Sequence, residues 1–136
     1  MEGPPGRTLA IQTSARAEAL NITKDVEAVV TASGIEDGIC VVFVPHTTAA
    51  VFLNENADPD ALADILSTLD RMVPWEAGYR HAEGNAAAHI KASLVGTSET
   101  IPVEDGRLSL GRWQGIFFAE FDGPRRRECR VSVQPK

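Results

Sequence analysis

Three histidines are the residues of this sequence best suited to bind a metal ion or carry a proton. His46 follows a run of apolar residues, His81 lies in a segment without periodicity, and His89 lies in an alanine-rich segment. Neutral imidazoles around an open coordination position are typical of a catalytic zinc or a similar ion. The sequence has no HxxxH or HExxH pair, so an ordinary surface or hydrogen-bonded role is the alternative for each histidine.

The segment from Glu83 to His89 combines an acid, an amide and an imidazole with three alanines. If a helix begins near Gly84, Asn85 and His89 are four residues apart and share one of its faces. The small alanines leave the start of this helix open, and its unpaired N–H groups can bind an anion. The alternative is that Glu83 simply caps the helix.

Polar residues also follow two consecutive apolar runs. His46, Thr47 and Thr48 place an imidazole and two hydroxyls at the end of an expected strand, where binding residues often lie on a rigid scaffold. Asn54 and Glu55 follow the next apolar run in the same way. An ordinary turn is the alternative for Asn54, because asparagine favours turns through local hydrogen bonds.

A further set of polar and aromatic residues flanks the next-to-last expected strand. Trp113 and Gln114 precede this strand, and the tryptophan fits the core better than a stacking surface. Asp122 follows the strand and can form an ion pair with Arg125 across the turn. Arg125 can instead offer its forked donors to a phosphate. A solvated face is the alternative for the three consecutive arginines at 125–127.

Composition limits the class of protein. The chain has 136 residues, 43% of them hydrophobic and 24% charged, which is typical of one globular domain. Its formal net charge is −6 with a single basic cluster, which argues against a nucleic-acid partner. No apolar run approaches the roughly 20 residues that span a membrane, and no signal peptide is evident. We therefore expect a cytoplasmic protein without a membrane partner.

The chemistry-bearing residues need a scaffold, and the pattern predicts a flexible tail at 1–6 and a single domain at 7–136. Cys40 and Cys129 lie in β-like runs, and we expect them to be buried thiols. The run at 39–44 predicts a central strand covered on both faces. The pattern predicts helices at 22–33, 59–73 and 84–95, a loop at 75–83, and other strands at 7–20, 49–53, 100–103, 107–110, 115–121 and 128–133. These elements indicate an α/β domain of the α+β type, with mixed or antiparallel pairing and about three helices.

The motifs, taken in order, resemble the YjbQ-like family, whose members are often described as secondary thiamine-phosphate synthases. The resemblance rests on PHTTAA at 45–50, NE at 54–55, DPD at 58–60, YRH at 79–81, EGN at 83–85, AHIK at 88–91, IPV at 101–103, LGRWQ at 110–114 and EFDGPR at 120–125. It implies an α/β sandwich that forms a homotrimer, with sheets packed around the threefold axis and sites near subunit interfaces. It also implies that the three histidines line one polar site.

The resemblance implies an enzyme that joins a pyrimidine pyrophosphate to a thiazole phosphate. A divalent metal (zinc, magnesium or manganese) would then be held by His46, His81 and His89. The catalytic group would be His46, Glu83, Asn85 and Lys91. The substrate and its phosphate would be bound by Thr47, Thr48, Asn54, Glu55, Trp113, Gln114, Asp122 and Arg125. Two alternatives use the same residues: a non-catalytic trimer that binds a metal or a phosphorylated metabolite, and a metal-dependent hydrolase of small phosphate esters.

Overall fold

The computed structural model describes residues 6–136, and positions 1–5 of the expected tail lie outside the described residues. Gly6, also expected in the tail, pairs with Ser132 as the first residue of a strand. The elements are β1 (Gly6–Gln12), β2 (Glu18–Asn21), α1 (Thr23–Ser33), β3 (Gly38–Phe43), β4 (Ala49–Glu55), α2 (Pro59–Met72), α3 (Ala86–Val95), β5 (Ser98–Glu104), β6 (Arg107–Leu108), β7 (Gln114–Glu120) and β8 (Arg126–Pro135). The expected α+β fold with three helices is confirmed for these residues.

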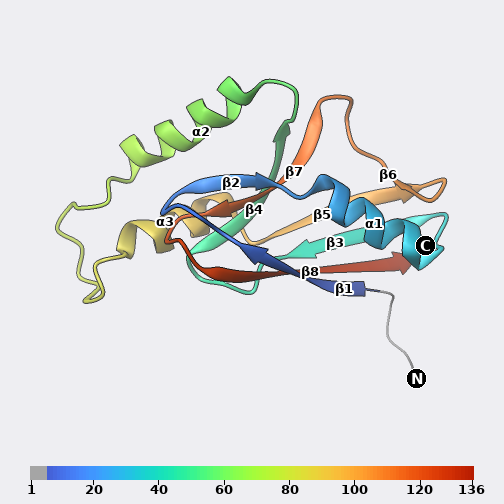
Figure 1. Cartoon of the computed structure of the whole chain (residues 1–136), viewed down its shortest axis with the longest axis horizontal. Coiled ribbons are helices and arrows are strands. Elements are labelled where there is room, and N and C mark those ends of the chain that lie inside the picture. Colours follow the sequence, from blue (N-terminus) through green and yellow to red (C-terminus); the bar gives the residue numbers. More distant parts are fainter. Residues whose placement is uncertain (1–5) are drawn as a thin grey trace.

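The strands form two sheets in which every pair is antiparallel. A five-stranded sheet has the order β1-β8-β3-β5-β6, and a three-stranded sheet has the order β2-β7-β4. Figure 1 shows the three-stranded sheet between α2, which lies above it in this view, and the larger sheet below. No helix in the described part of the chain is long and apolar enough to cross a membrane.

The main core fills the space between α1 and the facing sides of the two sheets. Val26 and Val30 of α1 pack there with Val42 of β3 and Phe118 of β7, all four of them almost completely buried. A second cluster lies on the opposite side of the three-stranded sheet, where α3 packs its alanines and α2 its leucines. The three-stranded sheet is therefore covered on both sides, and α3 is held against it by small side chains.

Local sequence signals explain the ends of the helices. The Asn21 side chain accepts a hydrogen bond of 3.0 Å from the Thr23 amide at the start of α1. Gly34 ends α1 with a φ of 69°, a left-handed conformation that glycine adopts without a steric penalty. The Asp58 carboxylate accepts from the Asp60 amide at the start of α2, with Pro59 in the first turn.

The expectation that β3 is covered on both faces is wrong for the described chain. Cys40 and Val42 are completely buried, whereas Ile39 and Phe43 on the opposite face are 40% and 39% exposed. β3 is central because it pairs with β5 and β8, yet only the inner face of this sheet packs against the core. An apolar run in the sequence does not by itself show whether both faces of a strand are buried. That depends on which layers of the fold pack against each face.

Candidate functional site

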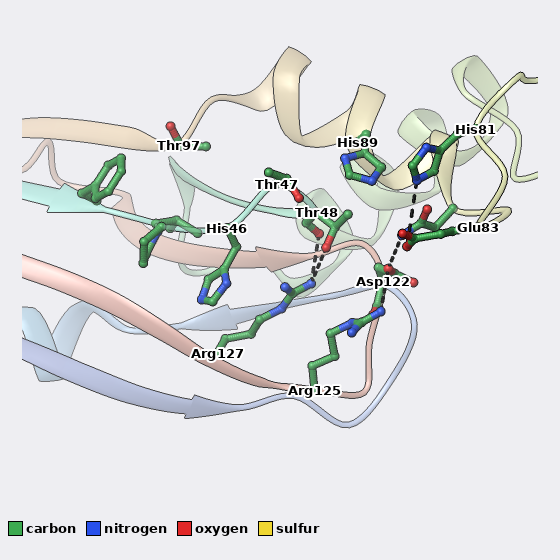
Figure 2. A pocket seen from close by; sticks show the side chains of 14 residues that line it. His46, Thr47, Thr48, His81, Glu83, His89, Thr97, Asp122, Arg125 and Arg127 are labelled. Atoms are coloured by element: carbon green, nitrogen blue, oxygen red, sulfur yellow. Dashed lines mark hydrogen bonds and ion pairs between the residues drawn. The ribbon is translucent and has the colours of Figure 1, made fainter.

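A pocket of about 610 Å³ opens where three segments far apart in sequence meet. Its walls come from the connection between β3 and β4, the segment that leads into α3, and the loop between β7 and β8; Figure 2 shows these side chains around a common space. The register explains the meeting, because Ala49 pairs with Glu120 and the Phe121 amide donates to the Thr48 carbonyl at 3.2 Å. The strand ends therefore bring the two connections side by side.

A buried ion pair between Glu120 and Arg127 lies next to this pocket, and Arg127 is one of the residues that line it. Glu120 is completely buried, Arg127 is 7% exposed, and the guanidinium donates to both carboxylate oxygens. Thr13 donates to the same carboxylate at 2.7 Å, and Arg127 also donates to the Thr48 hydroxyl at 2.8 Å. Burial raises the pKa of Glu120, but the hydrogen bonds from Arg127, Thr13 and the Asp122 amide outweigh burial and hold the pKa below its ordinary value. Arg127 therefore ties the β3–β4 connection to β8.

A second carboxylate, that of Asp122, joins the β7–β8 loop to the start of α3. Its Oδ2 atom accepts from Asn85 Nδ2 at 2.8 Å and from Arg125 Nη2 at 2.9 Å. The Arg125 Nε atom donates to the Asp122 carbonyl at 2.7 Å. The predicted ion pair across this turn is thus present, and it orients Arg125 along the pocket wall, as Figure 2 shows.

The start of α3 lies at the pocket, one or two residues later than the sequence indicated. Asn85 precedes the first helical residue, Ala86, and its carbonyl accepts from the amides of Ala88 and His89. Asn85 and His89, four residues apart, both line the pocket. Glu83 also lines it, but the carboxylate does not cap the helix among the described contacts; it lies 3.9 Å from His81 Nε2.

The histidines occupy two different parts of the pocket. The rings of His81 and His89 contact each other edge to face, with their centres 4.9 Å apart. His46 lies beside Arg127, with Thr47 and Thr48 between it and His89 in Figure 2. Its Nε2 atom accepts from the Glu128 amide at 2.9 Å, which makes Nδ1 the protonated nitrogen of the neutral ring. Burial, and then the nearby charge of Arg127, lower the pKa of His46.

The three histidines do not form one ligand set in this chain. Among residues 6–136, no three His, Cys, Asp or Glu side chains are close enough together to hold a metal ion. His46 is separated from the other two because its ring nitrogen is bound to the backbone of β8. His81 and His89 alone are fewer than the three protein ligands of a catalytic zinc site. The described residues therefore do not fit the expected three-histidine site.

Five residues expected in the site lie outside the pocket. Lys91 is 4% exposed and donates to Asp70 of α2 at 3.0 Å, so it joins two helices. The others lie at the far end of the β4–β7 pair, about 20 Å from Thr48 at roughly 3.3 Å per residue. They are Asn54, Glu55, Trp113 and Gln114. β4 runs away from the pocket and β7 runs towards it. Residues at the end of β4 and at the start of β7 therefore lie far from the pocket.

Trp113 also differs from the expectation that it belongs to the core. Its side chain is 55% exposed, and the Arg112 guanidinium lies 4.9 Å from the ring centre. Trp113 precedes the first residue of β7, before the chain enters the sheet. An aromatic residue next to a strand need not share the burial of that strand.

Sequence reasoning missed Arg127 and Glu120. The signal for Arg127 was its position in β8, since Arg127, Cys129 and Val131 are alternate residues and share the buried face. A charge on the inner face of a strand requires a buried partner, and Glu120 at the end of β7 supplies it. Both expected buried thiols, Cys40 and Cys129, are confirmed as free and buried.

The fold and the pocket define a class: a small α+β chain with two antiparallel sheets and a polar pocket at their connections. Residues 7–136 match the family model "UPF0047 protein YjbQ-like", and the chain belongs to this family. It is 51% identical to the UPF0047 protein YugU of Bacillus subtilis over 128 residues, covering 93% of this chain and 97% of the relative. It is also 51% identical to a UPF0047 protein of Methanocaldococcus jannaschii, covering 90% and 89%.

Solved structures show the same fold. A protein of the YjbQ/UPF0047 family from Clostridium acetobutylicum superimposes with a TM-score of 0.93 at 50% identity, over 94% of this chain and 99% of the other. A YbjQ-like protein of unknown function from Sulfolobus solfataricus gives a TM-score of 0.93 at 35% identity, over 96% of both chains. These comparisons establish the family and its fold, and the Sulfolobus protein is described as one of unknown function.

Proposed function

We propose that the pocket binds a small phosphorylated molecule. The observation that supports this is the shared carboxylate of Asp122, which brings Arg125 and the start of α3 to one side of the pocket. A guanidinium N–H group and the unpaired N–H groups at a helix start are both donors suited to phosphate oxygens. A pocket of about 610 Å³ is also of the size that holds a small ligand.

The two arginines of the pocket have different parts in this proposal. Arg127 is buried and bound to Glu120 and Thr48, so its charge is neutralised within the fold. Arg125 is 52% exposed and uses Nε and Nη2 for Asp122. Its Nη1 atom makes no hydrogen bond within residues 6–136, and we assign it to the phosphate. Thr47, His81 and His89 line the same space and provide further donors.

The reaction we propose for this site resembles that of a thiamine-phosphate synthase. The ring nitrogen of a thiazole phosphate attacks the methylene carbon of a pyrimidine pyrophosphate, a carbon–nitrogen bond forms, and the carbon–oxygen bond to pyrophosphate breaks. Pyrophosphate leaves with the electron pair, so negative charge develops on its oxygen atoms. Donors fixed before the reaction stabilise such charge most effectively. Arg125, His81 and His89 are placed to do so, and Asp122 keeps Arg125 in position.

No step of this reaction is assigned to a metal ion. His81 and His89 lie together and Glu83 is near His81, but no three such side chains of residues 6–136 are placed to hold a metal ion, so the donor set does not fit the expected ion. A zinc, magnesium or manganese ion would need further oxygen ligands from a bound phosphate. The proposed roles of Arg125 and of the start of α3 are independent of such an ion.

The test compares an arginine of the pocket with its neighbour outside it. Inorganic pyrophosphate is titrated calorimetrically into the wild type, Arg125→Gln and Arg126→Gln, and thiamine phosphate is assayed with the same proteins. Loss of one charged hydrogen bond weakens binding by about ten-fold or more in Arg125→Gln, whereas Arg126→Gln, on the exposed face of β8, binds like the wild type.

The outcomes separate the synthase that the family resemblance implies from the two alternatives that use the same residues. Pyrophosphate binding with thiamine phosphate formation, both weakened in Arg125→Gln, supports the synthase. Binding without product supports a phosphometabolite-binding protein, and release of inorganic phosphate from small esters supports a hydrolase. Failure of the wild type to bind either pyrophosphate or phosphate would refute the phosphate site itself.

We also propose that the chain assembles with copies of itself into a homotrimer. The observation behind this is the outer face of the five-stranded sheet, where Ile39 and Phe43 are exposed on a central strand. Phe43 also lines the pocket, so this face is continuous with the site. Light scattering of the wild type should give the mass of three chains, as should Thr31→Lys on the exposed side of α1. Ile39→Lys should give smaller species, and a monomeric wild type would overturn the proposal.

A further inference from the structure

One polar atom in the pocket wall has no partner. Asn85 is 8% exposed, and its Oδ1 atom is the buried side-chain oxygen without a hydrogen bond in the described part of the chain. Buried polar groups in native proteins are nearly always paired, and an unpaired one requires an explanation. Because Asn85 lines the pocket, a molecule in the pocket can supply the missing partner.

The orientation of the Asn85 amide follows from its neighbour. Its nitrogen, Nδ2, lies 2.8 Å from Asp122 Oδ2, an oxygen that also accepts from Arg125. A carboxylate paired with a guanidinium is ionised and can only accept, so the amide nitrogen must face it. The amide oxygen then faces the other way and needs a donor.

The donors nearest to Asn85 in the chain are already used or point along the helix. Arg125 directs Nε and Nη2 to Asp122. The amides of Ala88 and His89 donate to the Asn85 carbonyl, within the first turn of α3. The pocket wall therefore combines donors suited to an anion with one buried acceptor, which a fully deprotonated anion cannot satisfy.

We infer that the ligand is a phosphate ester that carries a hydroxyl or amino group close to its phosphate, and that this group donates to Asn85 Oδ1. The inference rests on the proposed phosphate site and makes it more specific. Asn85 Nδ2 and Arg125 Nη2 bind the same oxygen, so they lie within about 6 Å of each other, two hydrogen-bond lengths. The two side chains are therefore neighbours in the pocket wall, and we expect the donor of the ligand to lie near the phosphate bound by Arg125.

The experiment uses three esters of similar size: ethyl phosphate, hydroxyethyl phosphate and aminoethyl phosphate. Dissociation constants are measured by amide NMR titration of the full chain. The wild type should bind the hydroxyl or the amino ester about five- to ten-fold more tightly than ethyl phosphate, the effect of one hydrogen bond to a buried group. Asn85→Leu should remove this preference, and the control Asn54→Leu, an asparagine exposed at the far end of β4, should keep it.

The possible results distinguish this inference from the phosphate site. If the wild type binds all three esters equally, the phosphate site stands and the role of Asn85 is wrong. If none of the esters and no inorganic phosphate binds, both are wrong. If Asn85→Leu does not fold, the preference of the wild type among the three esters still tests whether the site favours a ligand with a donor group, because that measurement needs no variant.

Discussion

Replacing Glu120 by glutamine should destabilise the fold strongly, because it leaves the buried Arg127 charge without a counterion. The glutamate is completely buried and accepts hydrogen bonds from Arg127, Thr13 and the Asp122 amide. Breaking a buried ion pair by removing one partner costs about 3–5 kcal/mol. In addition, the side-chain nitrogen of the glutamine would face one of the donors that now bind the carboxylate, and that hydrogen bond would be lost. The cost is a large part of a typical stability of about 5–15 kcal/mol.

Urea unfolding at a fixed protein concentration measures this cost. Thermal unfolding gives a second measurement. At about 4 °C per kcal/mol for a domain of this size, the melting temperature should fall by about 12–20 °C. Glu128→Gln, an exposed glutamate on β8, is the matched control and should change stability by less than about 0.5 kcal/mol. Replacing the pair together, Glu120→Leu with Arg127→Met, should recover much of the loss.

The pH dependence gives an independent check. The folded-state pKa of Glu120 lies below its ordinary value, so the carboxylate stabilises the fold above that ordinary value. This contribution disappears as the pH falls through the lower folded-state pKa. The difference in free energy of unfolding between the wild type and Glu120→Gln should therefore become smaller at acidic pH. A difference below about 1 kcal/mol at neutral pH, with an unchanged denaturant slope, would show that the pair is not the structural element argued here.

Three further predictions concern other titratable groups. His46 should titrate by NMR below the ordinary histidine pKa, and since this pKa is lowered, its contribution to stability is lost as the pH falls through it. Burial raises the pKa of Cys40 to about 11 and that of Cys129 to about 12, so both thiols should react with iodoacetamide at pH of about 8 only after unfolding. Lys91→Met should keep pyrophosphate binding within about two-fold while changing the melting temperature, because Lys91 binds Asp70 and not the pocket.

Local signals in the sequence determined much of the fold. Asn21 and Gly34 mark the beginning and end of α1 through hydrogen bonding and a left-handed conformation, which depend on nearby residues alone. The two sides of β3 were a different matter. The sequence shows that Ile39 and Phe43 are apolar, but their exposure depends on which layer lies outside the sheet. That layer is a property of the tertiary or quaternary structure.

The candidate site shows the same distinction. Polar residues at the ends of elements were identified, and those at 46–48, 81–89 and 122–125 do line one pocket. Asn54 and Gln114 satisfied the same rule and lie at the opposite end of their strands. A position at the end of a strand does not show at which end of the sheet the residue lies. The pairing of Ala49 with Glu120 shows that the start of β4 and the end of β7 lie together, at the pocket.

Two acidic residues, Glu120 and Asp122, stabilise different parts of the pocket. Glu120 points into the core and neutralises Arg127, while Asp122, two residues further, faces the pocket and orients both Arg125 and Asn85. The Asp122 amide donates to Glu120, so the two carboxylates are coupled through one turn of backbone. A ligand bound by Nη1 of Arg125 would therefore contact the same loop that Glu120 fixes. The buried pair keeps this loop in place, and the outer pair holds Arg125 so that its Nη1 atom stays available to the ligand.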